Sequence, residues 1–286
     1  MSESEAHSHS PDPEEQRLPV PEQELLAVAH EAAQAAAAEL RPRFGARARD
    51  VHTKSTPTDL VSEADLAAEK AIRQVLQRRR PADGVLGEEG GATESAAPGP
   101  AHLQWVVDPL DGTVNFLFGI PAFAVSVACE SPSGALAGVV FDPIRQECFA
   151  ATRSGVATLN GRPIERPGRR DLGQAMVATG FGYDADVRRR QAAVLARVLP
   201  RVRDIRRVGA AALDLVWCAC GRYDAYYERG VQHWDVAAGS LIAERAGLEV
   251  RRLAPTRRDA AGIVVAPSCL IDELVELVVE SDQAGG

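Results

Sequence analysis

The sequence predicts an α/β (α+β) protein built as one compact unit with two lobes, of about residues 19–170 and 171–286. Three observations lead to this fold class. Amphipathic helical patterns open the chain, short apolar runs dominate residues 104–157, and strand-like and helix-like patterns alternate after residue 170. No Pro/Gly-rich linker long enough to separate independent domains interrupts these patterns.

Composition and charge disfavour several binding partners and a location within the membrane. It has 286 residues and a formal net charge of -8, which disfavours nucleic acid or an anionic membrane as the main partner. The chain contains no run of about 18 apolar residues, which is the length needed to cross a bilayer. Residues 1–18 are acidic, contain proline and lack an apolar signal core, so we expect a disordered tail. The five cysteines form no C-x-x-C pair, which fits a reducing cytosol, so we expect a cytoplasmic protein.

The first lobe is predicted to combine two helices with a mostly antiparallel sheet. Ser62 stands three residues before Asp65, the arrangement of a capping box at the start of the second helix. In order, the predicted elements are a helix over 21–40, a helix that ends before Arg80-Pro81, a strand at 85–86, a Gly-rich stretch at 87–91, a flexible loop over 92–100, and strands over 104–107, 123–129, 136–141 and 147–151.

The second lobe is predicted to alternate strands with helices. Glycine marks the end of two of these helices, at Gly221 and Gly247. The predicted strands cover 176–179, 204–207, 223–228 and 263–266, and the predicted helices cover 185–199, 210–220, 233–246 and 268–280.

The stretch 105–116, Trp-Val-Val-Asp-Pro-Leu-Asp-Gly-Thr-Val-Asn-Phe, places two carboxylates three residues apart behind an apolar run. Pro109 presets φ for a tight turn, which would bring Asp108 and Asp111 within roughly 7 Å at the Cα atoms. Such close carboxylates repel each other unless a cation lies between them. Gly112 lets the backbone approach a ligand, and the N–H groups that follow would meet an anion if a helix begins there. This order of residues suggests a cation site beside a phosphate site.

Further acidic residues suit the same site. Glu88-Glu89 follows a short strand, and Asp235 opens a predicted helix. Carboxylate oxygens favour magnesium, and no histidine cluster suggests zinc. Each motif also has a purely structural interpretation: Asp-Pro-x-Asp-Gly is a good turn sequence, while Asp65, Thr113 and Asp235 suit the first turn of a helix. The combination, rather than any single motif, favours a metal site.

The chain resembles the inositol monophosphatase family, the lithium-sensitive, magnesium-dependent phosphatases. The Asp-Pro-Leu-Asp-Gly-Thr motif and the later Trp-Asp-Val-Ala-Ala-Gly motif are the most specific parts of this resemblance. The resemblance implies the layered αβαβα sugar-phosphatase fold and a homodimer. The matching stretches occur in the family's order, at 54–65, 87–90, 105–116, 206–214 and 224–239.

The resemblance also implies a role for each matching residue. Glu88, Asp108 and the backbone carbonyl of Leu110 would hold one Mg²⁺ ion. Asp108 would bridge to a second ion, held also by Asp111 and Asp235. The implied cofactor is therefore Mg²⁺, with two or three ions per subunit.

A more weakly held third ion would lie near Glu88, Glu89 and Asp65. The resemblance places Thr113 beside the nucleophilic water, with Glu88 relaying its proton and Asp111 orienting the network. The implied mechanism is direct in-line attack of a metal-activated water on phosphorus, without a phosphoenzyme.

Substrate contacts are implied in the same way. The N–H groups of Gly112 and Thr113 would meet the phosphate, and Glu228 would accept hydrogen bonds from substrate hydroxyl groups. Ala210 departs from the family pattern, because many members have Ser or Thr there, so substrate preference is the property that this departure affects. The implied substrate-binding set is Glu88, Leu110, Asp111, Gly112, Thr113, Gly209, Ala210, Ala211, Glu228 and Asp235.

The function implied is hydrolysis of myo-inositol monophosphate, a small phosphorylated polyol, to inositol and phosphate. One alternative is a related phosphatase acting on fructose 1,6-bisphosphate, histidinol phosphate or adenosine 3′,5′-bisphosphate. Another is a regulatory binding protein on the same fold, which the intact ligand set and the acidic surface disfavour. A few polar contacts in the pocket would discriminate between these substrates.

Overall fold

The computed structural model describes residues 20–45, 52–53, 60–61, 63–94, 102–166 and 171–279. The predicted tail over 1–18, the capping residue Ser62 and most of the 54–65 stretch lie outside the described residues. None of the described helices combines the length and apolar character needed to cross a membrane.

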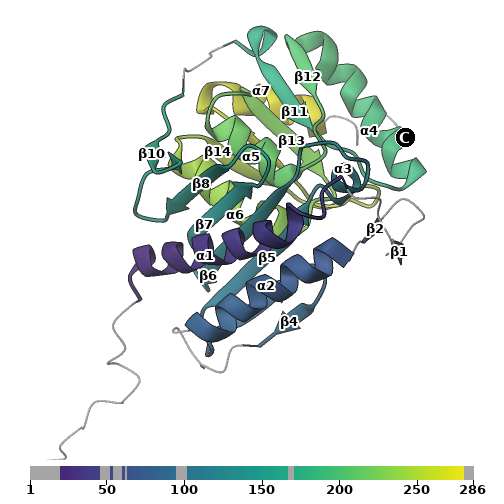
Figure 1. Ribbon diagram of the computed structural model, residues 1–286. Coiled ribbons are helices and arrows are strands. Elements are labelled where there is room, and N and C mark those ends of the chain that lie inside the picture. Colours follow the sequence, from purple (N-terminus) through teal and green to yellow (C-terminus); the bar gives the residue numbers. More distant parts are fainter. Residues whose placement is uncertain are drawn as a thin grey trace, which may run out of the picture.

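The fold consists of five layers, which confirms the predicted αβαβα arrangement (Figure 1). Helices α1 (Glu22–Leu40) and α2 (Glu63–Arg79) cover one face of the larger sheet. Helices α5 (Ala211–Ala219) and α6 (His233–Arg245) lie between the two sheets. Helices α4 (Ala185–Val198) and α7 (Ser268–Val279) form the outer layer on the smaller sheet.

In the described part of the chain, the larger sheet has eight strands in the order β10-β9-β8-β7-β6-β5-β3-β4, and the smaller has five in the order β12-β11-β13-β15-β14. The larger sheet is antiparallel except for the β3–β5 pair. Its strands are β3 (Gly84–Gly87), β4 (Gly91–Thr93), β5 (Gln104–Asp111), β6 (Ala124–Ser131), β7 (Gly134–Asp142), β8 (Glu147–Thr152), β9 (Thr158–Leu159) and β10 (Arg162–Pro163). The smaller sheet contains β11 (Met176–Thr179), β12 (Asp204–Arg206), β13 (Ala225–Arg229), β14 (Glu249–Leu253) and β15 (Gly262–Ala266), and a separate hairpin contains β1 (His52–Thr53) and β2 (Leu60–Val61).

Successive residues of a strand contribute to the hydrophobic cores on opposite faces of its sheet. On β5, Trp105 and Val107 join the cluster beneath α1 and α2, whereas Val106 joins the central cluster with α5 and α6. On β13, Tyr226 joins the central cluster and Tyr227 the outer one. Side chains alternate across a strand, so a strand buried on both faces needs a continuous apolar run. The apolar runs of β5 and β13 meet this need.

Small residues allow the central layer to pack closely. A Cβ added at Gly138 of β7 would lie 3.0 Å from Ala238 Cα on α6. One added at Gly239 would lie 2.7 Å from the Cδ1 atom of Leu215 on α5. The backbone of α6 therefore lies nearly against both its sheet and its neighbouring helix.

Two predictions about local structure were wrong, and the strand β14 was not predicted. The stretch 108–111 is not a free tight turn: β5 continues to Asp111, which pairs with Ala124 after a register shift that follows Asp108. Pro109 lies at this irregularity, where a missing N–H costs no ladder hydrogen bond. The first residues of the expected loop over 92–100 belong instead to strand β4. Strands β4 and β14 both lie at the edge of a sheet and lack a clean apolar alternation.

Candidate active site

Most of the predicted site residues converge on one cleft of about 540 Å³. The far end of β5 and the short helix α3 (Thr113–Leu117) form one wall. The turn after β3, the start of α5, the end of β13 and the first turn of α6 complete it. The cleft brings together Glu88, Asp108, Leu110, Asp111, Gly112, Thr113, Gly209, Ala210, Ala211, Glu228 and Asp235.

The irregular end of β5 fixes two buried carboxylates. Asp108 is 2% exposed, and its Oδ1 atom accepts a hydrogen bond from the N–H of Leu110 at 2.9 Å. Asp111 is 8% exposed, and its two oxygens accept the N–H groups of Ala211 at 3.1 Å and Ala212 at 2.6 Å. Since these N–H groups open α5, Asp111 joins the larger sheet to the start of that helix.

Gly112 and Thr113 continue this wall. Gly112 has φ +94°, and a Cβ there would lie 3.0 Å from the carbonyl oxygen of Ala122, so both conformation and space favour glycine. The Thr113 hydroxyl lies 3.1 Å from the Leu110 carbonyl oxygen and 3.2 Å from Asp65 Oδ1. Thr113 therefore uses its side chain in this network rather than as the cap of α3, whose N-cap is Gly112.

Asp235 is placed by a capping box. Its Oδ2 atom accepts the N–H of Gln232 at 2.7 Å, while the Gln232 side chain accepts an N–H from the first turn of α6. This reciprocal arrangement fixes where the helix begins. It also places the Asp235 carboxylate beside that of Asp108.

The carboxylates disfavour each other's charged forms. Removal from water, followed by the charges of Glu88, Asp111 and Asp235, raises the pKa of Asp108 well above its usual range. Burial raises the pKa of Asp111 to about 7 despite its two backbone hydrogen bonds. Burial and the charge of Asp111 raise the pKa of Asp235 to about 8. A divalent cation would relieve this repulsion.

The donor set fits a hard cation in its chemistry but not yet in its arrangement. All the side-chain donors of this cluster are carboxylate oxygens, which suit Mg²⁺. Among the described residues, no three acidic, histidine or cysteine side chains already have the geometry of a metal site. Asp108 and Asp235 each direct one oxygen to a backbone N–H group, and Asp111 directs both of its oxygens to such groups. The remaining lone pairs of these carboxylates are available to a metal ion.

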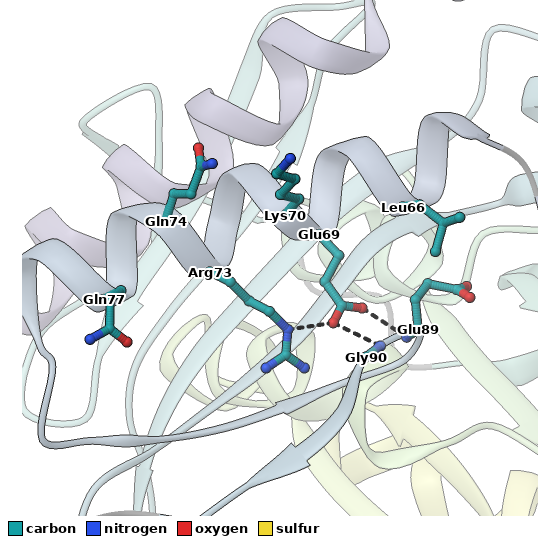
Figure 2. A pocket seen from close by; sticks show the side chains of 8 residues that line it. All are labelled: Leu66, Glu69, Lys70, Arg73, Gln74, Gln77, Glu89 and Gly90. Atoms are coloured by element: carbon teal, nitrogen blue, oxygen red, sulfur yellow. Dashed lines mark hydrogen bonds and ion pairs between the residues drawn. The ribbon is translucent and has the colours of Figure 1, made fainter.

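Two predicted residues lie outside the cleft lining. Asp65 is fully buried on α2, where it meets the Thr113 hydroxyl. Glu89 lines a different hollow, beside α2 (Figure 2). The adjacent residues Glu88 and Glu89 therefore belong to different surfaces. The cleft lining therefore contains the residues predicted for two ions, while Asp65 and Glu89, predicted for a third, lie outside that lining.

Glu228 lines the same cleft from β13. Its Oε2 atom accepts the hydroxyl of Tyr226 at 2.8 Å, and removal from water raises its pKa to about 7. A Cβ at Gly180 would lie only 2.0 Å from Oε2, so glycine is required beside this carboxylate.

Four arginines of the cleft were not predicted from the sequence. They gave no signal, because arginine supplies nearly every basic residue of this chain. The guanidinium of Arg207 lies 6.0 Å from the centre of the Phe181 ring, and Arg190 pairs with Asp259 at 3.1 Å. The arginines that line the cleft are Arg190, Arg207, Arg229 and Arg258.

This chain is similar to known proteins over most of its length. The model of the inositol monophosphatase family matches residues 22–283. The Inositol-1-monophosphatase SuhB of Mycobacterium tuberculosis is 45% identical over 267 residues, covering 88% of this chain and 92% of the relative. The Nus factor SuhB of Pseudomonas aeruginosa is 44% identical over 192 residues, covering 66% of this chain and 70% of the relative.

Solved structures show the same fold. The extragenic suppressor protein suhB from Bartonella henselae superposes with a TM-score of 0.82 at 34% identity, covering 92% of this chain and 99% of that one. Mycobacterium tuberculosis SuhB superposes with a TM-score of 0.75 at 38% identity, covering 91% and 97%. Sequence, fold and the acidic cleft together lead to one conclusion: this chain belongs to the inositol monophosphatase family.

Proposed function

We propose that this protein is a magnesium-dependent phosphomonoesterase that hydrolyses myo-inositol monophosphate to inositol and phosphate. One observation carries the proposal: Glu88, Asp108, Asp111 and Asp235 meet in a single cleft, with Glu228 lining the same cleft. Family membership and a relative named Inositol-1-monophosphatase SuhB support it.

The proposed metal ligands follow from this cluster. Glu88, Asp108 and the Leu110 carbonyl would hold one Mg²⁺, and Asp108, Asp111 and Asp235 would hold a second. When bound, the ions would supply an activated water for in-line attack and would neutralise charge on the leaving oxygen. We retain a third ion near Glu88, with Asp65 and Glu89, as a weaker part of the proposal.

The chain's own groups would position the substrate and move a proton. The Thr113 hydroxyl, held between Asp65 and the Leu110 carbonyl, would orient the attacking water, and the Glu88 carboxylate would accept its proton. The N–H groups of Gly112 and Thr113 would donate to phosphate oxygens. On the polyol side, Glu228 would accept hydroxyl hydrogen bonds beside the backbone of 209–211.

A phosphate-release panel tests the substrate. Inositol monophosphate, fructose 1,6-bisphosphate, histidinol phosphate and adenosine 3′,5′-bisphosphate are compared with added Mg²⁺, and each assay is repeated with EDTA and with Li⁺. We expect the highest kcat/KM for inositol monophosphate, no activity with EDTA and inhibition by Li⁺. A much higher kcat/KM for another member of the panel would overturn the preferred substrate while keeping the reaction.

A regulatory role is a second candidate, favoured by one observation: a relative 44% identical to this chain bears the name Nus factor SuhB. A pull-down at physiological salt, using the full chain as bait and its Asp235→Asn variant in parallel, tests this role. Recovery of RNA polymerase or RNA with both baits would support it. The formal charge of -8 argues against direct binding of nucleic acid.

We also propose that the protein acts in the cytoplasm as a homodimer. Light scattering coupled to size exclusion would then give twice the chain mass of 30.5 kDa.

A further inference from the structure

Behind the turn that carries Glu88, a buried carboxylate on α2 binds the backbone of that turn (Figure 2). Glu69 is 3% exposed. Its Oε2 atom accepts the N–H of Glu89 at 2.7 Å, and its Oε1 atom accepts the N–H of Gly90 at 2.9 Å. Two successive N–H groups of the turn are therefore bound by one carboxylate.

Arg73, one helical turn further along α2, completes the contact. Its Nε atom donates to Glu69 Oε1 at 2.7 Å, and its NH2 group donates to the carbonyl oxygen of Gly91 at 2.7 Å. Since the ion pair is partly buried, and each partner also bonds to the backbone, its geometry is fixed by more than the attraction of two charges. The pair thus binds both donors and an acceptor of the stretch 89–91.

The glycines of this turn are required by the same carboxylate. A Cβ at either Gly87 or Gly90 would lie 2.5 Å from Glu69 Oε1. Only a backbone without side chains at these two positions comes close enough for the hydrogen bonds to form. With the backbone bound on this side, Glu88 lines the acidic cleft and Glu89 lines the hollow beside α2.

The turn needs such an attachment because of the charges that it faces. Glu88 shares its cleft with Asp108, Asp111 and Asp235, and its charge is among the causes that raise the pKa of Asp108. Like charges so close repel, and Glu88, Glu89 and Gly90 form the tip of the β3–β4 hairpin, beyond its last ladder pair, Gly87 with Gly91. Without an opposing contact, we expect the turn to move away from the cleft.

We propose that Glu69 is a positioning residue, which holds the 87–91 turn through the N–H groups of Glu89 and Gly90 and thereby keeps the Glu88 carboxylate in the acidic cleft. This inference rests on the proposed function insofar as Glu88 is taken to be a magnesium ligand. Glu69 itself does not line the cleft, so its effect is exerted through the backbone of the turn.

Two variants and a control test the proposal on the metal-free full chain. Glu69→Gln keeps the shape of the side chain and one acceptor oxygen, whereas Glu69→Ala removes all three hydrogen bonds. Gln77→Ala is the matched control, because Gln77 is an exposed residue of the same helix and the same hollow. Hydrogen–deuterium exchange of peptides covering 84–94 is measured with EDTA, and Mg²⁺ binding is measured by calorimetry.

We expect exchange over 88–91 to be about tenfold faster in Glu69→Ala, with a smaller increase in Glu69→Gln and none in Gln77→Ala. Mg²⁺ affinity should fall in the same order. In phosphate release, raising Mg²⁺ should restore part of the kcat of Glu69→Gln but not that of Glu88→Gln, because a misplaced ligand is still present whereas a removed one is not.

Two results would overturn the proposal. One is unchanged exchange and unchanged Mg²⁺ affinity in Glu69→Ala. The other is faster exchange spread equally over α2, β3 and β5, which would make Glu69 a residue of general stability. A wild-type protein that binds Mg²⁺ but releases no phosphate from any substrate would contradict the proposed function instead, and the exchange and calorimetry would still decide the role of Glu69.

Discussion

Asp111 belongs to two structures at once. As a member of the acidic cluster it lies among carboxylates that disfavour its charge, and as the acceptor for Ala211 and Ala212 it completes the first turn of α5. Asparagine keeps one acceptor oxygen but presents an NH₂ group to the other N–H, a loss of about 1 kcal/mol. The same change removes the buried charge, and the two effects oppose each other.

We therefore expect Asp111→Asn to stay folded while losing phosphatase activity at least about a hundredfold. Phosphate release at saturating Mg²⁺ and thermal unfolding measure the two effects. Asp184→Asn is the matched control. Asp184 lines the same cleft as Asp111 and is the N-cap residue of α4, a role that asparagine fills equally well. An active Asp111→Asn enzyme would contradict the assignment.

Glu228 gives the proposed site a pH dependence. Because removal from water raises its pKa to about 7, the side chain is protonated at pH 6 and ionised at pH 8. An ionised acceptor binds substrate hydroxyl groups more strongly, so KM for inositol monophosphate should fall as pH rises through about 7. In Glu228→Gln, KM at pH 8 should be about tenfold above that of the wild type, with near equality at pH 6.

Steady-state kinetics of both proteins at pH 6, 7 and 8 check this expectation. Ionisation of the substrate phosphate also changes over this range, but it affects both proteins alike. KM values that are equal in wild type and Glu228→Gln at all three pH values would exclude a role for the Glu228 carboxyl.

At the scale of single residues, the sequence indicated the acidic set but not its surroundings. Asp108, Asp111 and Asp235 stand in motifs whose residue types reveal their chemistry. Glu69 lies in an ordinary amphipathic helix, where the sequence pattern predicts that a glutamate is exposed to solvent. Only the fold shows that β3 leads the Gly-rich turn back to this helix, so no local pattern could have found the contact.

Among the elements, α6 illustrates how close packing depends on missing side chains. Gly239 lies inside the helix, where alanine would normally be the better residue by about 1 kcal/mol. The added Cβ would, however, lie 2.8 Å from the Cβ of Leu215, an atom that cannot move without its backbone. Overpacking of this kind costs about 1–3 kcal/mol, so the steric effect should exceed the gain in helix propensity.

We expect Gly239→Ala to lower the free energy of unfolding by about 1 kcal/mol, measured in urea. Leu215→Ala should cost more, because it opens a cavity in the central core. The double variant should be destabilised by less than the sum of the two, since each change makes room for the other. Additive effects would show that Gly239 and Leu215 do not constrain each other.

The elements that could be predicted are those with a strong period. The helices around Leu25, Val194 and Leu274 and the buried strands were identified within a few residues of their observed bounds. The edge strands β4 and β14 were missed, because Gly91–Thr93 and Glu249–Leu253 carry little apolar alternation and are held by their neighbours. The extension of β5 through Asp111 was missed because Pro109 normally ends a strand.

At the scale of the whole molecule, the layered architecture followed from the family resemblance, and the alternation of patterns agreed with it. The position of the cleft did not follow from either. It depends on how α5 and α6 are held between the two sheets, which brings the end of β5 to the start of both helices. Such long-range packing has no counterpart in a local sequence window.

One consequence of this architecture concerns rates. The proposed magnesium ligands come from Glu88, the end of β5 and α6, so the site is complete only after the central layer has docked. Interactions that form after the transition state change the unfolding rate rather than the folding rate. Mg²⁺ at about a hundred times its dissociation constant should therefore slow unfolding by up to about a hundredfold and leave refolding almost unchanged, as measured by stopped-flow fluorescence with Mg²⁺ or EDTA. Faster refolding with Mg²⁺ would mean that the ligands meet early. If refolding is unchanged, the metal binds only after the transition state, so it lengthens the lifetime of the folded protein without accelerating its formation.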